Sequence, residues 1–240
     1  MRLEPTAWKA ATAKRFDEIA EDWRKRRIID QERVKPFIEN LNCPPGSLIL
    51  DAGCGSGNWS APLALQGYRV RGFDISPQMV AEAQVVLSEA GLSAEQANIS
   101  LGDAEEIRFP DATFDAIMCI NVLDFTPQPG KALQEFGRVL RPEGRLVLLT
   151  LGAYSPVKRQ WWKRFLPEDD QLHTGNDILP WEMEALLEEL GWQIVAQEPL
   201  FGPAMNGVSN NFDAEKVAQL TDRVLQQAIA SAWKFVATKP

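Results

Sequence analysis

The stretch "LILDAGCGSGNWSAPLALQGYRVRGFD" (residues 48–74) decides the fold of this chain. It opens with a short apolar run, continues through Gly53, Gly55 and Gly57, and ends in a second apolar run that closes on Asp74. An apolar strand, a glycine turn, a helix and a second strand in this order predict a βαβ unit with parallel strands. Glycines without Cβ atoms let the main chain touch a ligand, and the following helix directs its free N–H groups to the same place.

The alternation of strand and helix continues beyond this stretch, five times over about residues 47–151. Stacked βαβ units place helices on both faces of a parallel sheet, so we expect an α/β fold. The expected strands are 47–53, 68–74, 98–103, 114–122, 145–152, 193–201 and 231–240. The expected helices are 13–40 (one helix or a pair), 58–67, 76–91, 129–144 with its closing Pro-Glu-Gly turn, 179–192 and 213–230.

Composition narrows the class of protein. The 240 residues are 45% hydrophobic and 24% charged, which fits one large soluble domain. A net charge of −8 makes an acidic surface that repels phosphate backbones, so we expect no nucleic-acid partner. We see no secretory signal and no membrane-spanning run, which predicts a cytoplasmic protein without a membrane partner. Cys43, Cys54 and Cys119 show no metal-binding pattern, so we expect reduced thiols and no metal.

Polar side chains follow successive strands, at the edge where ligands bind in open α/β sheets. Asp74, after the second strand, suits two hydrogen bonds from the vicinal hydroxyls of a ribose. Asp103, after the third strand, suits an exocyclic amine such as that of adenine, and Asn121 follows the fourth. Two plainer explanations stay open: a tight strand-to-helix turn for the glycines, and an Asx turn at "FDISP" for Asp74.

Glycine spacing separates the classes of nucleotide-binding protein. The third glycine comes one residue earlier than in the dinucleotide fingerprint G-x-G-x-x-G, and no lysine follows that would make a P-loop. Four stretches, "LILDAGCGSG", "GFDIS", "GDAEEIRFPDATFDAI" and "FGRVLRPEGRLVLL", do occur in the order and spacing of one family. Over residues 47–151, and in its "FDEIAEDW" leader, the chain resembles the class I S-adenosylmethionine-dependent methyltransferases.

The resemblance implies a fold and a cofactor. The fold is a Rossmann-like three-layer sandwich with a seven-stranded, mostly parallel sheet whose last strand is antiparallel, in agreement with the seven expected strands. The cofactor is S-adenosyl-L-methionine. The implied activity is methyl transfer to a small-molecule acceptor, with acceptor, methyl carbon and sulfur held in line.

The resemblance also implies roles for the matching residues. The loop of Gly53, Cys54, Gly55 and Gly57 faces the methionine part of the cofactor, and Asp51 lies near its ammonium. Asp74 holds the ribose hydroxyls. The resemblance also places Ile75 and Met79 beside the adenine, and Asp103 and Ala104 at its amine and ring edge. It places Asn121 and Val122 at the sulfonium, and Glu105 in the same cofactor-binding set. Phe16 and Trp23 either cover the cofactor or belong to the apolar stripe of the leader helix.

Two positions depart from the pattern of the family. Many relatives carry His or Glu just after the fourth strand, where this chain has Leu123-Asp124-Phe125, so no catalytic base is assigned. Candidates by position alone are Asp124, Tyr154 and the sole histidine, His173. The turn before the fifth strand is Pro142-Glu143-Gly144, where Pro-Gly-Gly is common; this change is harmless if Gly144 takes a positive φ.

The chain is expected to be a single methyltransferase domain, residues 1–240. Its parts are a helical leader (1–46), the cofactor-binding core (47–151), an insertion (152–178) and the C-terminal part of the sheet (179–240). The insertion is either an acceptor lid or a surface helix. As a lid, it would bring an aromatic pair and four cations to the acceptor: Trp161, Trp162, Lys158, Arg159, Lys163 and Arg164. The basic run "WRKRR" (23–27) is either a solvated helix face or an anion site.

Two other functions stay open at this stage. One is a non-catalytic S-adenosylmethionine-binding relative that keeps the nucleoside pocket. The other is an NAD-dependent oxidoreductase, which the early third glycine and Asp103 disfavour. The acceptor atom and the oligomeric state are not encoded in any motif that we find.

Overall fold

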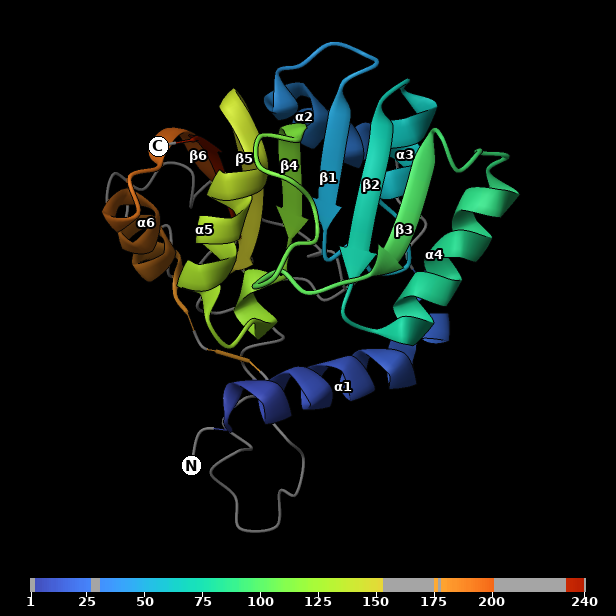
Figure 1. Ribbon diagram of the computed structural model, residues 1–240, viewed down its shortest axis with the longest axis horizontal. Helices are drawn as coiled ribbons and strands as arrows, with labels where there is room; N and C mark the ends of the chain where they lie inside the picture. The colour runs from blue at the N-terminus through green and yellow to red at the C-terminus, as the bar shows by residue number, and fades with distance from the viewer. Residues whose placement is uncertain (1–2, 27–30, 153–174, 177, 201–231, 240) are drawn as a thin grey trace.

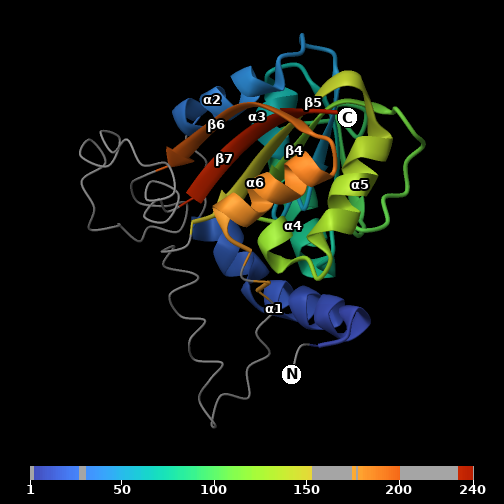
Figure 2. The same ribbon diagram turned by 90° about the vertical axis from the view of Figure 1, so that its left-hand side faces the viewer.

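The computed structural model describes residues 3–26, 31–152, 175–176, 178–200 and 232–239. Seven strands form one sheet in the order β3-β2-β1-β4-β5-β7-β6, and β7 runs antiparallel to both of its neighbours (Figures 1 and 2). The strands are β1 (Leu48–Ala52), β2 (Arg69–Asp74), β3 (Ala97–Leu101), β4 (Phe114–Ile120), β5 (Leu140–Leu151), β6 (Gln193–Leu200) and β7 (Ala232–Thr238). The expected Rossmann-like α/β sheet is confirmed.

Helices cover both faces of the sheet and make three layers (Figure 2). One face packs against α2 (Gln31–Leu41), α3 (Ser60–Leu65) and α4 (Pro77–Glu89), and the other against α5 (Pro129–Val139) and α6 (Pro180–Glu189). The central strands are buried on both sides, which explains why "LIL" and "RLVLLTL" are continuously apolar rather than alternating. None of the helices in the described ranges is both long and apolar enough to cross a membrane.

The start of α4 follows the local signal in the sequence. Ser76 is the N-cap, and its hydroxyl accepts a hydrogen bond from the Met79 backbone N–H at 3.0 Å. Pro77 occupies the first helical position, where its missing N–H costs nothing. This cap sets the path of the chain directly after Asp74, at the edge of the sheet where ligands bind.

Two boundaries correct the expectations. The leader is two helices, and the first, α1 (Pro5–Arg26), begins well before residue 13, with Pro5 at the position that suits its fixed φ. β5 begins at Leu140, so the expected turn at residues 142–144 lies inside the strand, at a shift of register against β4. Glu143, not Gly144, has the positive φ, 65°. Gly144 is needed for space, because a Cβ there would lie 2.8 Å from the Leu140 side chain.

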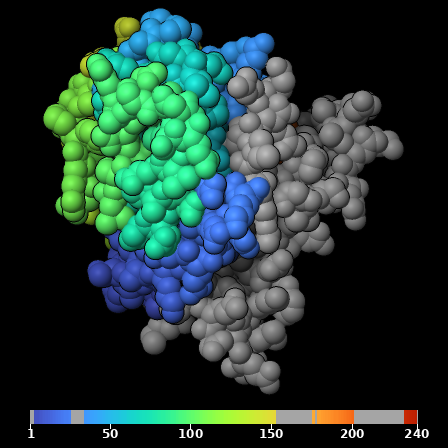
Figure 3. All heavy atoms as spheres, turned by 90° about the vertical axis from the view of Figure 1, so that its right-hand side faces the viewer, coloured from blue at the N-terminus to red at the C-terminus, as the bar shows by residue number. Residues whose placement is uncertain are grey.

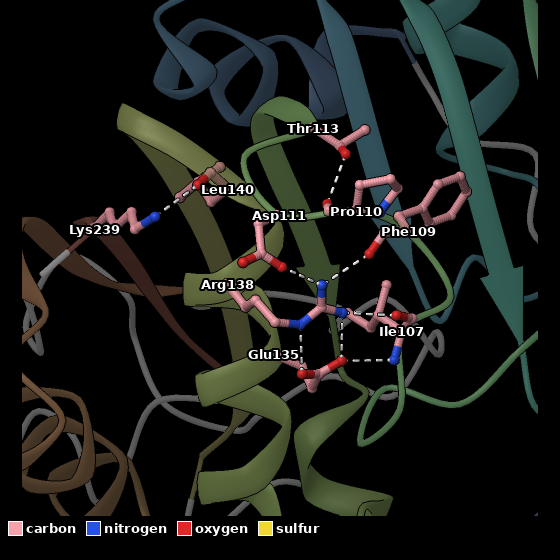
Figure 4. A network of polar contacts seen from close by, with 9 residues as sticks. All are labelled: Ile107, Phe109, Pro110, Asp111, Thr113, Glu135, Arg138, Leu140 and Lys239. Atoms are coloured by element: carbon pink, nitrogen blue, oxygen red, sulfur yellow. Dashed lines mark hydrogen bonds and ion pairs between the residues drawn. The ribbon is translucent and has the colours of Figure 1, made fainter.

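Arg138 on α5 fixes the loop that leads from the candidate site back to β4. Its guanidinium donates to the Ile107 carbonyl at 2.7 Å, to the Phe109 carbonyl at 2.8 Å and to the Asp111 carboxylate at 2.8 Å. Glu135 accepts two further bonds from Arg138 and one from the Ile107 N–H (Figure 4). These carboxylates raise the pKa of Arg138, so the cation is permanent. The loop is thereby tied to α5 along its length.

Two expected features lie outside the described residues. The insertion, with its proposed lid, falls almost wholly in 153–174, and the helix expected at 213–230 falls in 201–231. The remaining strands and helices occur close to where the sequence predicts them.

Candidate functional site

A cavity opens at the carboxyl ends of β1, β2, β3 and β4, where the strand order changes direction between β1 and β4. Ten of the predicted cofactor-binding residues line it: Gly53, Cys54, Gly55, Asp74, Ile75, Met79, Asp103, Ala104, Asn121 and Val122. Phe16 and Trp23 line it too. The structure does not bring three predicted cofactor residues, Asp51, Gly57 and Glu105, to the cavity wall, nor the candidate base Asp124.

The glycine loop has two kinds of glycine. A Cβ on Gly53 would lie 2.3 Å from Val122 Cγ2, which leaves no room for a side chain. A Cβ on Gly57 would lie 3.1 Å from Ala83 of α4, a tight contact at a residue whose φ is positive, 79°. A Cβ on Gly55 would meet nothing nearer than Trp23 Nε1 at 3.8 Å. The space beside Gly55 therefore belongs to the cavity, and its positive φ of 53° turns the main chain toward it.

Asp74 connects this loop to the start of α4. One carboxylate oxygen accepts from the Gly55 N–H at 2.9 Å, and the other accepts from the Ser76 N–H at 2.9 Å. Burial raises the pKa of Asp74 against the opposing effect of these hydrogen bonds. Each oxygen keeps a lone pair for a further donor, so the carboxylate can receive a pair of hydroxyl groups.

Asp103 shares a cation with Glu105. Lys9 Nζ lies 2.7 Å from Asp103 Oδ2 and 2.7 Å from Glu105 Oε2. Glu105 also accepts a hydrogen bond from the Gln128 N–H at 2.8 Å, at the beginning of α5. Its carboxylate is therefore engaged in contacts within the protein. Asp103 remains on the cavity wall with its second oxygen bonded to the Glu105 N–H at 2.8 Å.

Asp51 is buried and does not line the cavity. Its carboxylate accepts a hydrogen bond from the Ser60 hydroxyl at 2.5 Å. Burial raises the pKa of Asp51 to about 7, and the nearby charge of Asp74 acts in the same direction. Asp51 therefore joins the end of β1 to the first residue of α3.

Asp124, one of the three candidate bases, is fully buried. It accepts from the Thr150 hydroxyl at 3.0 Å and from the Leu151 N–H at 3.2 Å, so it joins the 3₁₀ turn Leu123–Phe125 to the end of β5. The other two candidates, Tyr154 and His173, lie outside the described residues.

Helix α1 crosses the strand ends and covers the cavity (Figure 1). Near its start the Trp8 indole donates to the Phe125 carbonyl at 2.8 Å. In its middle, Asp17 accepts from the Ser76 hydroxyl at 2.5 Å, and near its end Arg24 pairs with Glu82 of α4. The blue atoms of α1 abut the teal atoms of α4 in the space-filling view (Figure 3).

Sequence reasoning missed two residues on the cavity-facing side of α1. Lys9 and Thr12 line the cavity with Phe16, and all three lie on one helix face. The ring of Phe16 meets that of Phe125 edge to face at 5.2 Å, which closes the apolar part of the wall. Pro5 marks the true start of the helix, but no signal in the sequence places that helix over the cavity.

Buried polar atoms without partners identify where a ligand would bind. Among the described residues, three side-chain atoms are buried with no hydrogen bond: Thr12 Oγ1, Trp59 Nε1 and Asn121 Oδ1. All three belong to residues on the wall of this one cavity. Leaving such groups unsatisfied costs about 1–3 kcal/mol each, so a polar ligand is the natural partner.

Comparisons with known proteins agree with this geometry. A family described as "Methyltransferase domain" matches residues 50–148. The chain is 30% identical to a ubiquinone biosynthesis O-methyltransferase of Xanthomonas axonopodis pv. citri, over 63% of this chain and 64% of that protein. It is 33% identical to the protein of the same name from Dechloromonas aromatica, over 84% of this chain and 90% of that protein.

The chain belongs to the class I S-adenosylmethionine-dependent methyltransferases. A solved S-adenosylmethionine-dependent methyltransferase from Aquifex aeolicus has the same fold, with a TM-score of 0.61, 17% identity and full coverage of both chains. The cofactor of this methyltransferase family is S-adenosyl-L-methionine, an adenine nucleoside joined through sulfur to an amino acid. Adjacent carboxylates at Asp74 and Asp103, open space at Gly55 and three unsatisfied polar atoms fit such a molecule.

Proposed function

We propose that this chain transfers the methyl group of S-adenosylmethionine to a small-molecule acceptor, in the cavity at the carboxyl ends of β1 to β4. The observation that carries the proposal is the joint placement of Gly55, Asp74 and Asp103 on one cavity wall. They follow three adjacent strands, so their spacing suits an extended nucleoside. Asp74 would hold the ribose hydroxyls, and Asp103 with the Ala104 backbone would hold the adenine edge.

The bound cofactor supplies a methyl group on a positively charged sulfur, which is a good leaving group. The protein's own contribution is positioning and the exclusion of water. Phe16 and Trp23 on α1, with Phe125 after β4, form an aromatic wall on the side of the cavity that faces α1. Good alignment of the reacting atoms can contribute about 7–11 kcal/mol to lowering the barrier.

The acceptor is proposed to be small and to react through oxygen. Relatives named ubiquinone biosynthesis O-methyltransferase support this class of acceptor for the present chain. A base is required only if the acceptor atom must lose a proton. Because Asp124 is buried and bonded to β5, we favour an acceptor that is already acidic, or a base outside the described residues. The lid at 152–178, the absence of a nucleic-acid partner and a cytoplasmic location remain predictions.

Calorimetry and a transfer assay test the proposal. Isothermal titration should show binding of S-adenosylhomocysteine and none of NAD. Incubation with cofactor carrying a tritiated methyl group and fractionated small-molecule extracts should then label a low-molecular-weight product. Binding of NAD in preference to S-adenosylhomocysteine would reject the cofactor assignment. Cofactor binding without labelling of any fraction would favour the non-catalytic relative.

A further inference from the structure

Thr12, on α1, presents an unused hydroxyl group to the cavity. The residue is 5% exposed and lies on the cavity wall, and its Oγ1 has no hydrogen-bond partner among the described residues. A threonine inside a helix commonly donates to the carbonyl group one turn before it, which Thr12 does not do. Its O–H is therefore available to donate to an oxygen atom of a ligand.

Arg15 follows Thr12 by one turn of α1 and lies against another residue of the wall. Its Cζ is 5.4 Å from the centre of the Phe125 ring, and Phe125 lines the cavity. Burial lowers the pKa of Arg15, and within the described part of the chain no ion pair with a carboxylate opposes this effect. Because arginine stays charged in proteins, an uncompensated positive charge lies beside the wall.

The other cations of α1 whose surroundings the structure describes are compensated. Those that pair with a carboxylate are Lys9, Arg24 and Lys25. Lys14, next to Arg15 in the sequence, is exposed to water. In a chain with 33 acidic residues and a net charge of −8, a cation withdrawn from water without an acid indicates an anionic ligand.

The described part of the cavity wall offers no general base for an acceptor that must lose a proton. Asp74 and Asp103 are assigned to the cofactor, and Lys9 is an ion-paired ammonium. Burial raises the pKa of Cys54 well above its usual value, so its thiol stays protonated. An acceptor that already carries an anionic oxygen needs no base.

We propose that the methyl acceptor is a flat organic carboxylate, held by a hydrogen bond from the Thr12 hydroxyl and by the positive charge of Arg15. The inference rests on the proposed function and narrows its acceptor to one chemical class. The rings of Phe16 and Phe125 meet edge to face and give this part of the wall an apolar lining. Such a lining suits the flat, apolar remainder of the acid.

Methyl transfer to a carboxylate balances without a proton. A carboxylate oxygen attacks the methyl carbon, so that a C–O bond forms and the C–S bond breaks with its electron pair moving to sulfur. The products are a methyl ester and S-adenosylhomocysteine. The charges of the carboxylate and the sulfonium cancel in this step, which an apolar wall favours.

Two ligands of nearly equal shape test the anion site. 2-Naphthoate carries a carboxylate, and 2-naphthamide carries a neutral group of similar size. By calorimetry in the presence of S-adenosylhomocysteine, the wild type should bind naphthoate about 10-fold more tightly than naphthamide. Arg15→Met should remove this preference, and Arg15→Lys, which keeps the charge, should retain part of it. Thr12→Val keeps the shape of the side chain and should weaken naphthoate binding about 10-fold.

Lys14→Met is the matched control. Lys14 is the neighbouring cation on α1, but it is exposed and not on the cavity wall. This variant should bind both ligands as the wild type does. Thermal unfolding confirms that each variant is folded. Thr12→Val should be at least as stable as the wild type, because the hydroxyl group that it loses has no partner, and it carries the test if Arg15→Met does not fold.

The bond in the methylated product gives a second test. Small-molecule extracts are incubated with the wild type and cofactor carrying a tritiated methyl group, and the labelled product is treated with mild alkali. A methyl ester is split and releases volatile tritiated methanol, whereas a methyl ether is not split. We expect the tritium to become volatile.

Three results would overturn the inference while the proposed function stands. The first is a wild type that binds S-adenosylhomocysteine but does not prefer naphthoate to naphthamide. The second is an Arg15→Met protein that keeps the full preference, and the third is a labelled product whose tritium resists alkali. A wild type that does not bind S-adenosylhomocysteine, or that labels no fraction, would instead overturn the proposed function, and this inference with it.

Discussion

Lys9 Nζ, on the helix that covers the cavity, lies 2.7 Å from Asp103 Oδ2, at the end of β3. The same ammonium lies 2.7 Å from Glu105, whose side chain is only 1% exposed. One cation thus joins α1, which covers the cavity, to the loop that would contact the adenine. Its positive charge offsets the negative charges of two neighbouring carboxylates.

Replacing Lys9 by Met should release this end of α1. It leaves the buried Glu105 carboxylate without its cation, so we expect the free energy of unfolding to fall by about 1–3 kcal/mol. Urea unfolding measures the loss, and affinity for S-adenosylhomocysteine should fall with it. Lys25→Met is the control, because its ion pair with Glu21 is exposed and stability should not change. Equal losses of stability in the two variants would show that the ion pairs of Lys9 do not hold α1 in place.

Replacing Asp74 by Asn tests the ribose contact. The amide keeps the size of the carboxylate, but its NH₂ group cannot accept from Gly55 or Ser76, and the charge is lost. We expect affinity for S-adenosylhomocysteine to fall about 10- to 100-fold, as for a lost charge-assisted hydrogen bond. Calorimetry measures it, with thermal unfolding to separate binding from stability. Such titrations are precise to about twofold. An affinity within about twofold of that of the wild type would therefore show that the ribose hydroxyls bind elsewhere.

The pKa of Asp51 predicts how stability depends on pH. Burial raises this pKa from 3.8 to about 7, so the folded protein keeps a proton here that the unfolded chain has released. The contribution of Asp51 is therefore most favourable below pH 4 and is lost as the pH rises toward 7, by at most about 4 kcal/mol.

Asp51→Asn removes this titration. We expect its stability, relative to that of the wild type, to increase steadily between about pH 4 and pH 8, because only the wild type must bury a charge at the end of β1. Guanidinium unfolding at several pH values gives the difference. A difference that is constant with pH would show that Asp51 titrates normally.

The contacts of Arg138 predict a stabilising role for the loop after Asp103. Lys in its place keeps the charge but cannot serve Glu135, Asp111 and two carbonyl groups together. We expect Arg138→Lys to lower the free energy of unfolding by about 1–3 kcal/mol. Arg141→Lys, at a more exposed position, should change it by less than about 0.5 kcal/mol. A larger loss of stability for Arg141→Lys than for Arg138→Lys would show that the hydrogen bonds of Arg138 contribute little.

The parts of the site that the sequence predicts are those with a local signal. Gly53, Gly55, Asp74 and Asp103 each follow a short apolar run, and a buried parallel strand brings the ends of such runs to one edge. The central strands β1, β4 and β5 are predictable for the same reason, because most of their apolar residues are consecutive in the chain.

The parts that escaped prediction depend on contacts between distant segments. Lys9 and Thr12 reach the cavity because α1 crosses four strand ends, and the sequence gives no signal for where a helix will lie. Trp59 matters because its N–H has no partner, which only the packed structure reveals. The direction of the Asp51 side chain at the end of β1 decides whether it reaches the cavity or Ser60 of α3, and the sequence pattern does not distinguish the two.

A crystal structure of the chain with S-adenosylhomocysteine will show whether Asp74 holds the ribose. We expect ligand density in the cavity beneath α1, with both ribose hydroxyls within hydrogen-bond distance of the Asp74 carboxylate and the adenine amine beside Asp103. An occupied site elsewhere, or a ligand in this cavity whose sugar lies away from Asp74, would contradict it.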